Sequence, residues 1–236
     1  MLLYDVKRSL LSKRMLVVVL FGLVCLYQPT LYLKMMEDRW IWESDLISSL
    51  QDALGLGIFE FCAPATAALC ASALYVQDRR TGVLPLYIAR VGRRRYIFSK
   101  LMCCGLSGAL SLALPILIFS FLQFALYAGW KCAAGDWKTI FIDVLTYIPY
   151  GFLWATVGLA LSTWTDSAQV AYAAPYAIAM TMKTFSDSCG QWLDPSRQVS
   201  PLNGTLMDWR LIVLIQMCEL LLCVGLLHWG VRRCAE

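Results

Sequence analysis

The stretch QDRRTGVLPLYIARVGRRRYIFSK, residues Gln77–Lys100, organises the rest of this chain. It contains seven of the 20 lysine and arginine side chains and one acidic side chain. Long apolar segments, Leu54–Val76 and Leu101–Trp130, precede and follow it. Because short loops rich in lysine and arginine remain on the cytoplasmic side of a membrane, the stretch predicts a cytoplasmic loop between two membrane spans.

The overall composition also indicates a membrane protein. The 236 residues are 59% hydrophobic and 15% charged, with a mean hydropathy of +0.62. A soluble domain has about 45–50% apolar and about 25% charged residues. Lipid is therefore predicted to be the solvent for much of the chain. Nucleic-acid binding is not expected from the arginines, because the basic cluster would lie against a membrane.

Six apolar segments are long enough, or nearly long enough, to cross a bilayer, which needs ~20 helical residues. The fifth is the weakest, because it is short, rich in alanine and interrupted by Pro175, and it could be a tilted or partly re-entrant helix. The predicted fold is an all-α polytopic membrane protein with one transmembrane domain, residues 1–236. The predicted spans are Met15–Leu33, Leu54–Val76, Leu101–Trp130, Thr139–Leu161, Ser167–Lys183 and Trp209–Val231.

Both ends of the chain are predicted to be cytoplasmic. With the N-terminus inside, the cytoplasmic segments contain 13 of the 20 lysines and arginines, and the outer loops contain most of the acids. Residues Met1–Arg14 have apolar side chains at helical spacing, with Lys7 and Arg8 at the edge of the apolar face. This pattern predicts an amphipathic helix at the cytoplasmic interface. The alternative is a frayed tail whose charges only orient the first span.

Three acidic residues fall within the predicted spans. A charged side chain at the bilayer centre costs on the order of 3 kcal/mol, so such groups face other helices or a wet cavity. Glu60 and Glu219 are candidates for lining a substrate or ion pathway, and the alternative is that they fix helix packing by hydrogen bonds. Asp143 is expected to lie close enough to the outer face to be solvated.

The chain has no catalytic or metal-binding motif. It contains one histidine, His228, and no Cys-x-x-Cys pair, so no metal site is predicted. Phosphate-binding loops and hydrolase motifs are also absent, so no catalytic residue is predicted and an energy source must be an ion gradient or another subunit. Cys132 and Cys189 lie in two predicted outer loops and could form a disulfide in an oxidising compartment.

The central loop resembles a feature of one transporter family. Asp78, the segment Thr81–Leu84, the cluster Arg93–Arg95, Tyr96 and the pair Ser99–Lys100 follow one another between the second and third spans. This order resembles the permeases of ABC-2 type exporters, the type V or ABCG-like membrane subunits, in which a cytoplasmic coupling helix joins these spans. The resemblance extends to six spans, cytoplasmic ends and an amphipathic N-terminus.

The resemblance implies a half-transporter in a bacterial plasma membrane. Two such subunits, identical or related, would pair with two separate ATP-binding cassette subunits that bind ATP and Mg, and this chain would carry no cofactor. The residues expected to dock on the ATPase are Gly82, Val83, Leu84, Leu86, Tyr87 and Ile88. The residues expected to lie near anionic lipid headgroups and to set orientation are Lys7, Arg8, Arg79, Arg80, Arg93, Arg94 and Arg95.

The resulting prediction is a permease subunit, not an enzyme. It would move an amphipathic substrate (a lipid, drug or antimicrobial peptide) across the membrane, driven by the separate ATP-binding subunit. One alternative is an ion-gradient-driven carrier that uses Glu60 or Glu219 as a proton site. Another is a membrane scaffold that transports nothing.

Overall fold

The computed structural model describes residues 6–7, 9–36, 50, 53–54, 58–126, 134–189 and 209–233. Within these residues the fold is all-helical and contains no strand, as predicted. The helices are α2 (Lys13–Met36), α4 (Ile58–Leu69), α5 (Leu74–Arg80), α6 (Leu84–Val91), α7 (Arg93–Leu126), α8 (Ala134–Thr165), α9 (Ala168–Cys189) and α10 (Trp209–Arg233).

Among the described residues, four helical segments are long and apolar enough to cross a membrane. They are Ile58–Arg80, which comprises α4 and α5, then Arg93–Ala125 in α7, Trp137–Thr165 in α8 and Ile212–Arg232 in α10. These segments support the prediction of a multi-pass membrane protein. The segments predicted as spans one and five form α2 and α9, which are helical but are not among these four.

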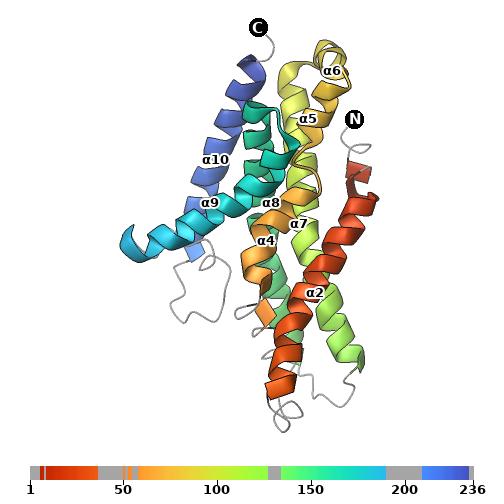
Figure 1. Ribbon diagram of the computed structural model, residues 1–236, viewed down its shortest axis with the longest axis vertical. Helices are drawn as coiled ribbons and strands as arrows, with labels where there is room; N and C mark the ends of the chain where they lie inside the picture. The colour runs from red at the N-terminus through yellow and green to blue at the C-terminus, as the bar shows by residue number, and fades with distance from the viewer. Residues whose placement is uncertain are drawn as a thin grey trace.

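The long helices α7 and α8 form the centre of the bundle (Figure 1). Helices α2 and α4 pack against α7, α4 also packs against α8 and α9, and α10 packs mainly against α8. Helix α9 runs obliquely across the bundle, and its later half leans away from α7 and α8 (Figure 1). The start of α2, the short helix α6 and the end of α10 all lie at the same end of the molecule (Figure 1).

Glycines allow α7 and α8 to approach within backbone contact. A Cβ atom added at Gly151 would lie 2.6 Å from the carbonyl oxygen of Gly108, so neither position has room for a side chain. A Cβ added at Gly158 would lie equally close, 2.6 Å, to the carbonyl oxygen of Ala171 in α9. Small residues promote this kind of packing between helices in lipid, and these glycines fix where α8 meets its neighbours.

Buried hydroxyl groups find partners on their own helices. Each of the following donates a hydrogen bond of 2.6–2.8 Å to a carbonyl three or four residues earlier: Ser107, Ser111, Ser120, Thr156, Ser162 and Thr163. Ser162 also donates to the carbonyl of Ser72, at 3.1 Å, in the turn between α4 and α5. An interruption of a helix within a membrane is tolerated where other protein groups form hydrogen bonds with the exposed backbone groups. The Ser162 hydroxyl forms one such bond between α4 and α5.

The outward faces of α2 and α10 are apolar. In the most apolar stretch of α10 only 11% of the residues are buried, compared with 61% for each of the other three candidate spans. Exposed apolar side chains on α10 are Val213, Leu214, Met217, Leu221, Leu222 and Trp229. An apolar surface of this extent is unfavourable in water and is the surface expected of a helix that faces lipid.

Candidate functional site

The short helix α6 forms a hairpin with α5 and α7 at the basic end of the bundle. Gly82 and Gly92 flank it with φ angles of 69° and 82°, in the left-handed region that side-chain-bearing residues avoid. Pro85 is the second residue of α6, where the absence of its N–H costs no hydrogen bond. The two glycines let the chain turn sharply before and after the helix, so that α6 lies between α5 and α7 as a separate element.

The six residues predicted to dock on a partner do not share one face of α6. Leu84 is buried, and Tyr87 and Ile88 are half-buried against the core. Leu86 points away from the bundle with 67% of its surface exposed. Gly82 is exposed and Val83 is half-buried before the helix begins. The exposed face of α6 therefore presents Leu86, while Leu84 anchors the helix to the bundle.

A buried ion pair holds the hairpin together. The Lys100 ammonium lies 2.9 Å from Oδ2 of Asp78, and their side chains are 4% and 11% exposed. The Tyr96 hydroxyl donates a second hydrogen bond to the same Asp78 oxygen, at 3.0 Å. The Lys100 ammonium also lies 5.8 Å from the ring centroid of Tyr87 in α6 and 5.7 Å from that of Tyr96, within cation–π range.

This cluster joins all three helices of the hairpin, because Asp78 lies in α5, Tyr87 in α6, and Tyr96 and Lys100 in α7. Removal of one partner from a buried ion pair leaves an uncompensated charge, which is strongly unfavourable. Asp78 and Lys100 entered the sequence analysis only as parts of a motif. Their pairing was not predicted. The sequence does offer one indication of it, because Asp78 is the single acid of this stretch and Lys100 is the lysine that ends it.

A second ion pair connects the hairpin to the turn between α8 and α9. Arg79 pairs with Asp166, whose φ angle of 51° places it in the left-handed region between the two helices. Both side chains are about two-fifths exposed (41% and 44%), so solvent screens the interaction and its contribution is about 0–1 kcal/mol. The contact therefore constrains where the hairpin lies against the turn between α8 and α9, and it adds little to the free energy of folding.

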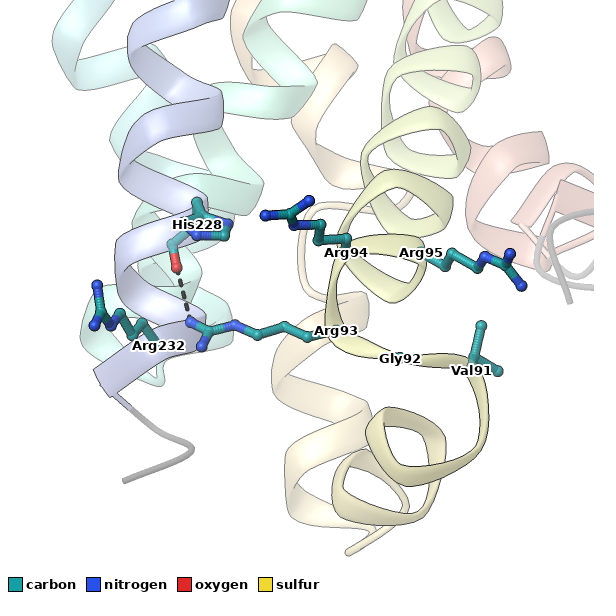
Figure 2. Close-up of a pocket in the computed structure, with 7 residues that line it drawn as sticks. All are labelled: Val91, Gly92, Arg93, Arg94, Arg95, His228 and Arg232. Atoms are coloured by element: carbon teal, nitrogen blue, oxygen red, sulfur yellow. Dashed lines mark hydrogen bonds between the residues drawn. The ribbon is translucent and has the colours of Figure 1, made fainter.

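Arginines at the start of α7 line an open pocket of about 600 Å³ that reaches the end of α10 (Figure 2). The Arg93 guanidinium crosses between the helices and donates a 3.0 Å hydrogen bond to the carbonyl oxygen of His228. The lining residues are Val91, Gly92, Arg93, Arg94, Arg95, His228 and Arg232.

The remaining basic residues predicted to meet lipid headgroups lie in different surroundings. Lys7 and Arg80 are exposed, and Arg79 is paired with Asp166 as described above. Arg8 lies outside the described residues. Of the seven predicted headgroup residues, Arg93, Arg94 and Arg95 line the pocket.

Glu60 is paired rather than isolated. Its carboxylate oxygen Oε1 lies 3.3 Å from the Lys183 ammonium of α9, and the Lys183 ammonium lies 4.1 Å from the ring centroid of Phe61. The pair joins α4 to α9, which is the packing role left open by the sequence. Lys183 ends the predicted fifth span, and nothing in the sequence connects it with Glu60.

Asp143 is buried, so the expectation that it is solvated was wrong. Only 5% of its surface is exposed, and its Oδ2 atom has no hydrogen-bond partner among the described residues. The reason is the length of α8, which begins at Ala134 and not at Thr139. Asp143 therefore lies more than two turns inside the helix, where α8 packs against the bundle.

Glu219 does not join Glu60. It lies in the middle of α10, half-buried, with no ionic or hydrogen-bond partner among the described residues. Helix α10 packs mainly against α8, whereas Glu60 faces α9. The structure therefore brings together no single pathway lined by both glutamates.

The predicted disulfide lies outside what the structure describes, because Cys132 is outside the described residues and the side chain of Cys189 is not described. No group of three or more His, Cys, Asp or Glu side chains that could hold a metal occurs among the described residues.

Comparison with known proteins identifies no relative of this chain. No protein-family model, no curated protein and no solved structure matches it. The function must therefore be argued from the membrane architecture, the α6 hairpin and the distribution of charge.

Proposed function

We propose that this chain is the membrane-spanning permease subunit of an ATP-driven exporter of the ABC-2 type, located in a bacterial plasma membrane. The observation that carries the proposal is α6, a helix of eight residues fastened at the basic end of a membrane bundle with Leu86 exposed. A loop that only oriented the protein would need its arginines but no packed helix. An outward apolar side chain on a fixed helix fits docking to a second protein.

The proposed topology has six spans with both ends in the cytoplasm. Helices α2 and α9 add to the four candidate spans, α9 as a tilted helix. Arginines occur in α5, in α6 and at the start of α7, and α6 lies at the end of the bundle where α2 begins and α10 ends (Figure 1). That asymmetry favours placing this end inside, where an ATP-binding subunit and its ATP and Mg are found.

The proposed assembly contains two permease subunits, identical or related, and two ATP-binding cassette subunits. The proposed substrate is amphipathic, a lipid, drug or antimicrobial peptide, as the resemblance to exporters of this type implies. Glu60 is a weaker candidate for the proton site of the alternative, an ion-gradient-driven carrier, because its carboxylate is paired with the Lys183 ammonium. Glu219 is the remaining candidate for a proton site in that alternative.

The test is co-purification with an ATP-binding subunit encoded beside this chain, together with ATPase activity. Replacement of Leu86 by Asp is expected to abolish co-purification, because it places a charge in an apolar contact. The variant Leu86→Met is the matched control, since it keeps an apolar side chain of similar volume, and it should retain binding.

Leu86 is the docking residue to replace, because it is the exposed apolar side chain of α6. Leu84 and Ile88 face the bundle, so their replacement by Asp would disrupt folding as well as docking. Full binding by Leu86→Asp, at unchanged thermal stability, would overturn the docking role of α6. Proton-driven transport by the chain alone, lost in Glu219→Gln, would establish the carrier instead.

A further inference from the structure

The pocket between the start of α7 and the end of α10 gathers positive charge from two distant parts of the sequence. Arg93, Arg94 and Arg95 come from α7, and His228 and Arg232 come from α10. No carboxylate lies among the lining residues that the structure describes. Arg93, Arg94 and Arg95 are three consecutive cations at the start of one helix, and they repel one another unless an anion lies near them.

The backbone adds to this positive field. Helix α7 begins at Arg93, and the N–H groups of its first turn have no partner within the helix. The helix dipole places a partial positive charge at the same point, which makes helix starts suitable for phosphate. The positive φ of Gly92 turns the chain away from α7 immediately before this start.

Side-chain directions define the part of the pocket that an anion would occupy. In Figure 2 the Arg94 side chain extends toward His228, whereas Arg95 points away from α10. Arg93 is held across the gap by its bond to the His228 carbonyl, and its buried Nε has no hydrogen-bond partner among the described residues. Arg93 and Arg94 therefore extend from α7 into the space between the two helices, whereas in this view Arg232 extends from the other side of α10 (Figure 2).

The surroundings indicate the depth of the pocket in the membrane. Trp229 follows the pocket-lining His228 in the chain, and its ring centroid lies 4.7 Å from that of Trp164 in an edge-to-face arrangement. The indole nitrogen of Trp164 donates to the carbonyl oxygen of Leu226, two residues before His228, at 3.3 Å. Tryptophan is enriched at the headgroup level of bilayers, so the pocket lies where lipid phosphates lie.

We propose that this pocket binds a phosphate group, and that an anionic phospholipid of the inner leaflet supplies it. Arginines bind phosphate oxygens through paired N–H donors, and Arg93 and Arg94 supply such donors beside the first turn of α7. The exposed apolar side chains Leu221 and Leu222 lie earlier on α10 and continue from the pocket toward the bilayer centre, where acyl chains run. A bound lipid would join α7 to α10, two helices that otherwise make few contacts. The proposal does not depend on the permease assignment.

The test measures lipid binding to the full-length chain purified in a neutral detergent. Dioleoyl-phosphatidylglycerol is titrated and bound lipid is counted by native mass spectrometry, with dioleoyl-phosphatidylcholine and inorganic phosphate as separate arms. Phosphatidylglycerol is expected to bind at least tenfold more tightly than phosphatidylcholine, whose choline offsets the phosphate charge. Inorganic phosphate is expected to bind at least tenfold more weakly than phosphatidylglycerol, because it has no acyl chains.

Two double variants distinguish lipid binding in the pocket from non-specific attraction of anionic lipid to the basic end of the bundle. Arg93→Ala with Arg94→Ala removes the two lining charges that extend toward α10, and Arg80→Ala with Arg90→Ala removes two exposed charges from the same end outside the pocket. The first pair should weaken phosphatidylglycerol binding at least tenfold and the second less than threefold. If the first pair lowers thermal stability, the single variant Arg94→Ala replaces it, since that side chain is exposed.

Three results would overturn the proposal. Equal losses in the two double variants would mean that only diffuse charge acts. Equal affinity for phosphatidylcholine would mean that the phosphate charge is not recognised. Binding of inorganic phosphate as tight as that of phosphatidylglycerol would overturn the lipid as the source.

Discussion

Replacement of Lys100 by Met is predicted to destabilise the chain strongly. The Lys100 ammonium lies 2.9 Å from the Asp78 carboxylate, and both side chains are almost fully buried. The variant leaves this carboxylate buried with one hydrogen bond, from the Tyr96 hydroxyl. Breaking a buried ion pair on one side costs about 3–5 kcal/mol. At about 2–4 °C per kcal/mol for a chain of this size, the Tm should fall by about 6–20 °C.

The assay is thermal unfolding of the purified chain in detergent, followed by circular dichroism and by cleavage with trypsin. The double variant Lys100→Met with Asp78→Asn should recover more than half of the lost stability, because neither charge is then left buried. Arg80→Met is the control, since it removes a cation from an exposed position one turn or less from Asp78 and should change stability by less than about 0.5 kcal/mol.

Two outcomes would refute this reasoning. A Tm for Lys100→Met within about 2 °C of the unsubstituted chain would mean that solvent reaches the pair and screens it. A double variant whose loss equals the sum of the two single losses would mean that the two side chains do not interact.

Three further predictions concern packing. Gly151→Ala should lower the free energy of unfolding by about 1–3 kcal/mol, because the added Cβ meets a backbone carbonyl at 2.6 Å. Gly225→Ala should raise it by about 0.5–1 kcal/mol, because no atom lies within 4 Å of the added Cβ. Both are measured by thermal unfolding, and equal effects would contradict the close crossing of α7 and α8. Leu84→Ala should cost about 2–4 kcal/mol and Leu86→Ala less than about 0.5, measured by thermal unfolding, since only Leu84 is buried. Glu60→Gln should cost about 1–2 kcal/mol by losing its partner on α9, and a variant as stable as the parent would argue against the ion pair.

Much of the fold was predictable because apolar length and basic loops are strong signals. The α6 helix, Leu84–Val91, overlaps the apolar insert recognised between the two arginine clusters. Its boundaries follow from Gly82, Pro85 and Gly92, which are local signals that a sequence displays directly. The tilt of α9 agrees with the doubt about span five, because alanine and polar residues dilute its apolar surface.

The partners of the charged residues were not predictable in the same way. In a helix that is apolar on every side, lipid-facing and protein-facing residues look alike, so the sequence does not show which neighbour a residue meets. Glu60 and Lys183 lie 123 positions apart, and nothing local to either residue indicates the other. Asp143 was misplaced because its solvation was judged from a helix start at Thr139, five residues too late.

The fastening of α6 to α7 by Lys100 has a mechanical consequence. Helix α7 rises about 1.5 Å per residue, so about 33 Å separate Arg93 from Pro115, the residue at which a backbone donor is missing. A tilt of about 5° imposed on α6 would move the α7 axis at Pro115 sideways by about 3 Å over this length. Pro115 packs against Gly22 of α2, where an added Cβ would lie 2.8 Å from its ring. A small movement of the hairpin would therefore be amplified along α7, and it would displace the contact between α2 and α7 at Gly22 and Pro115.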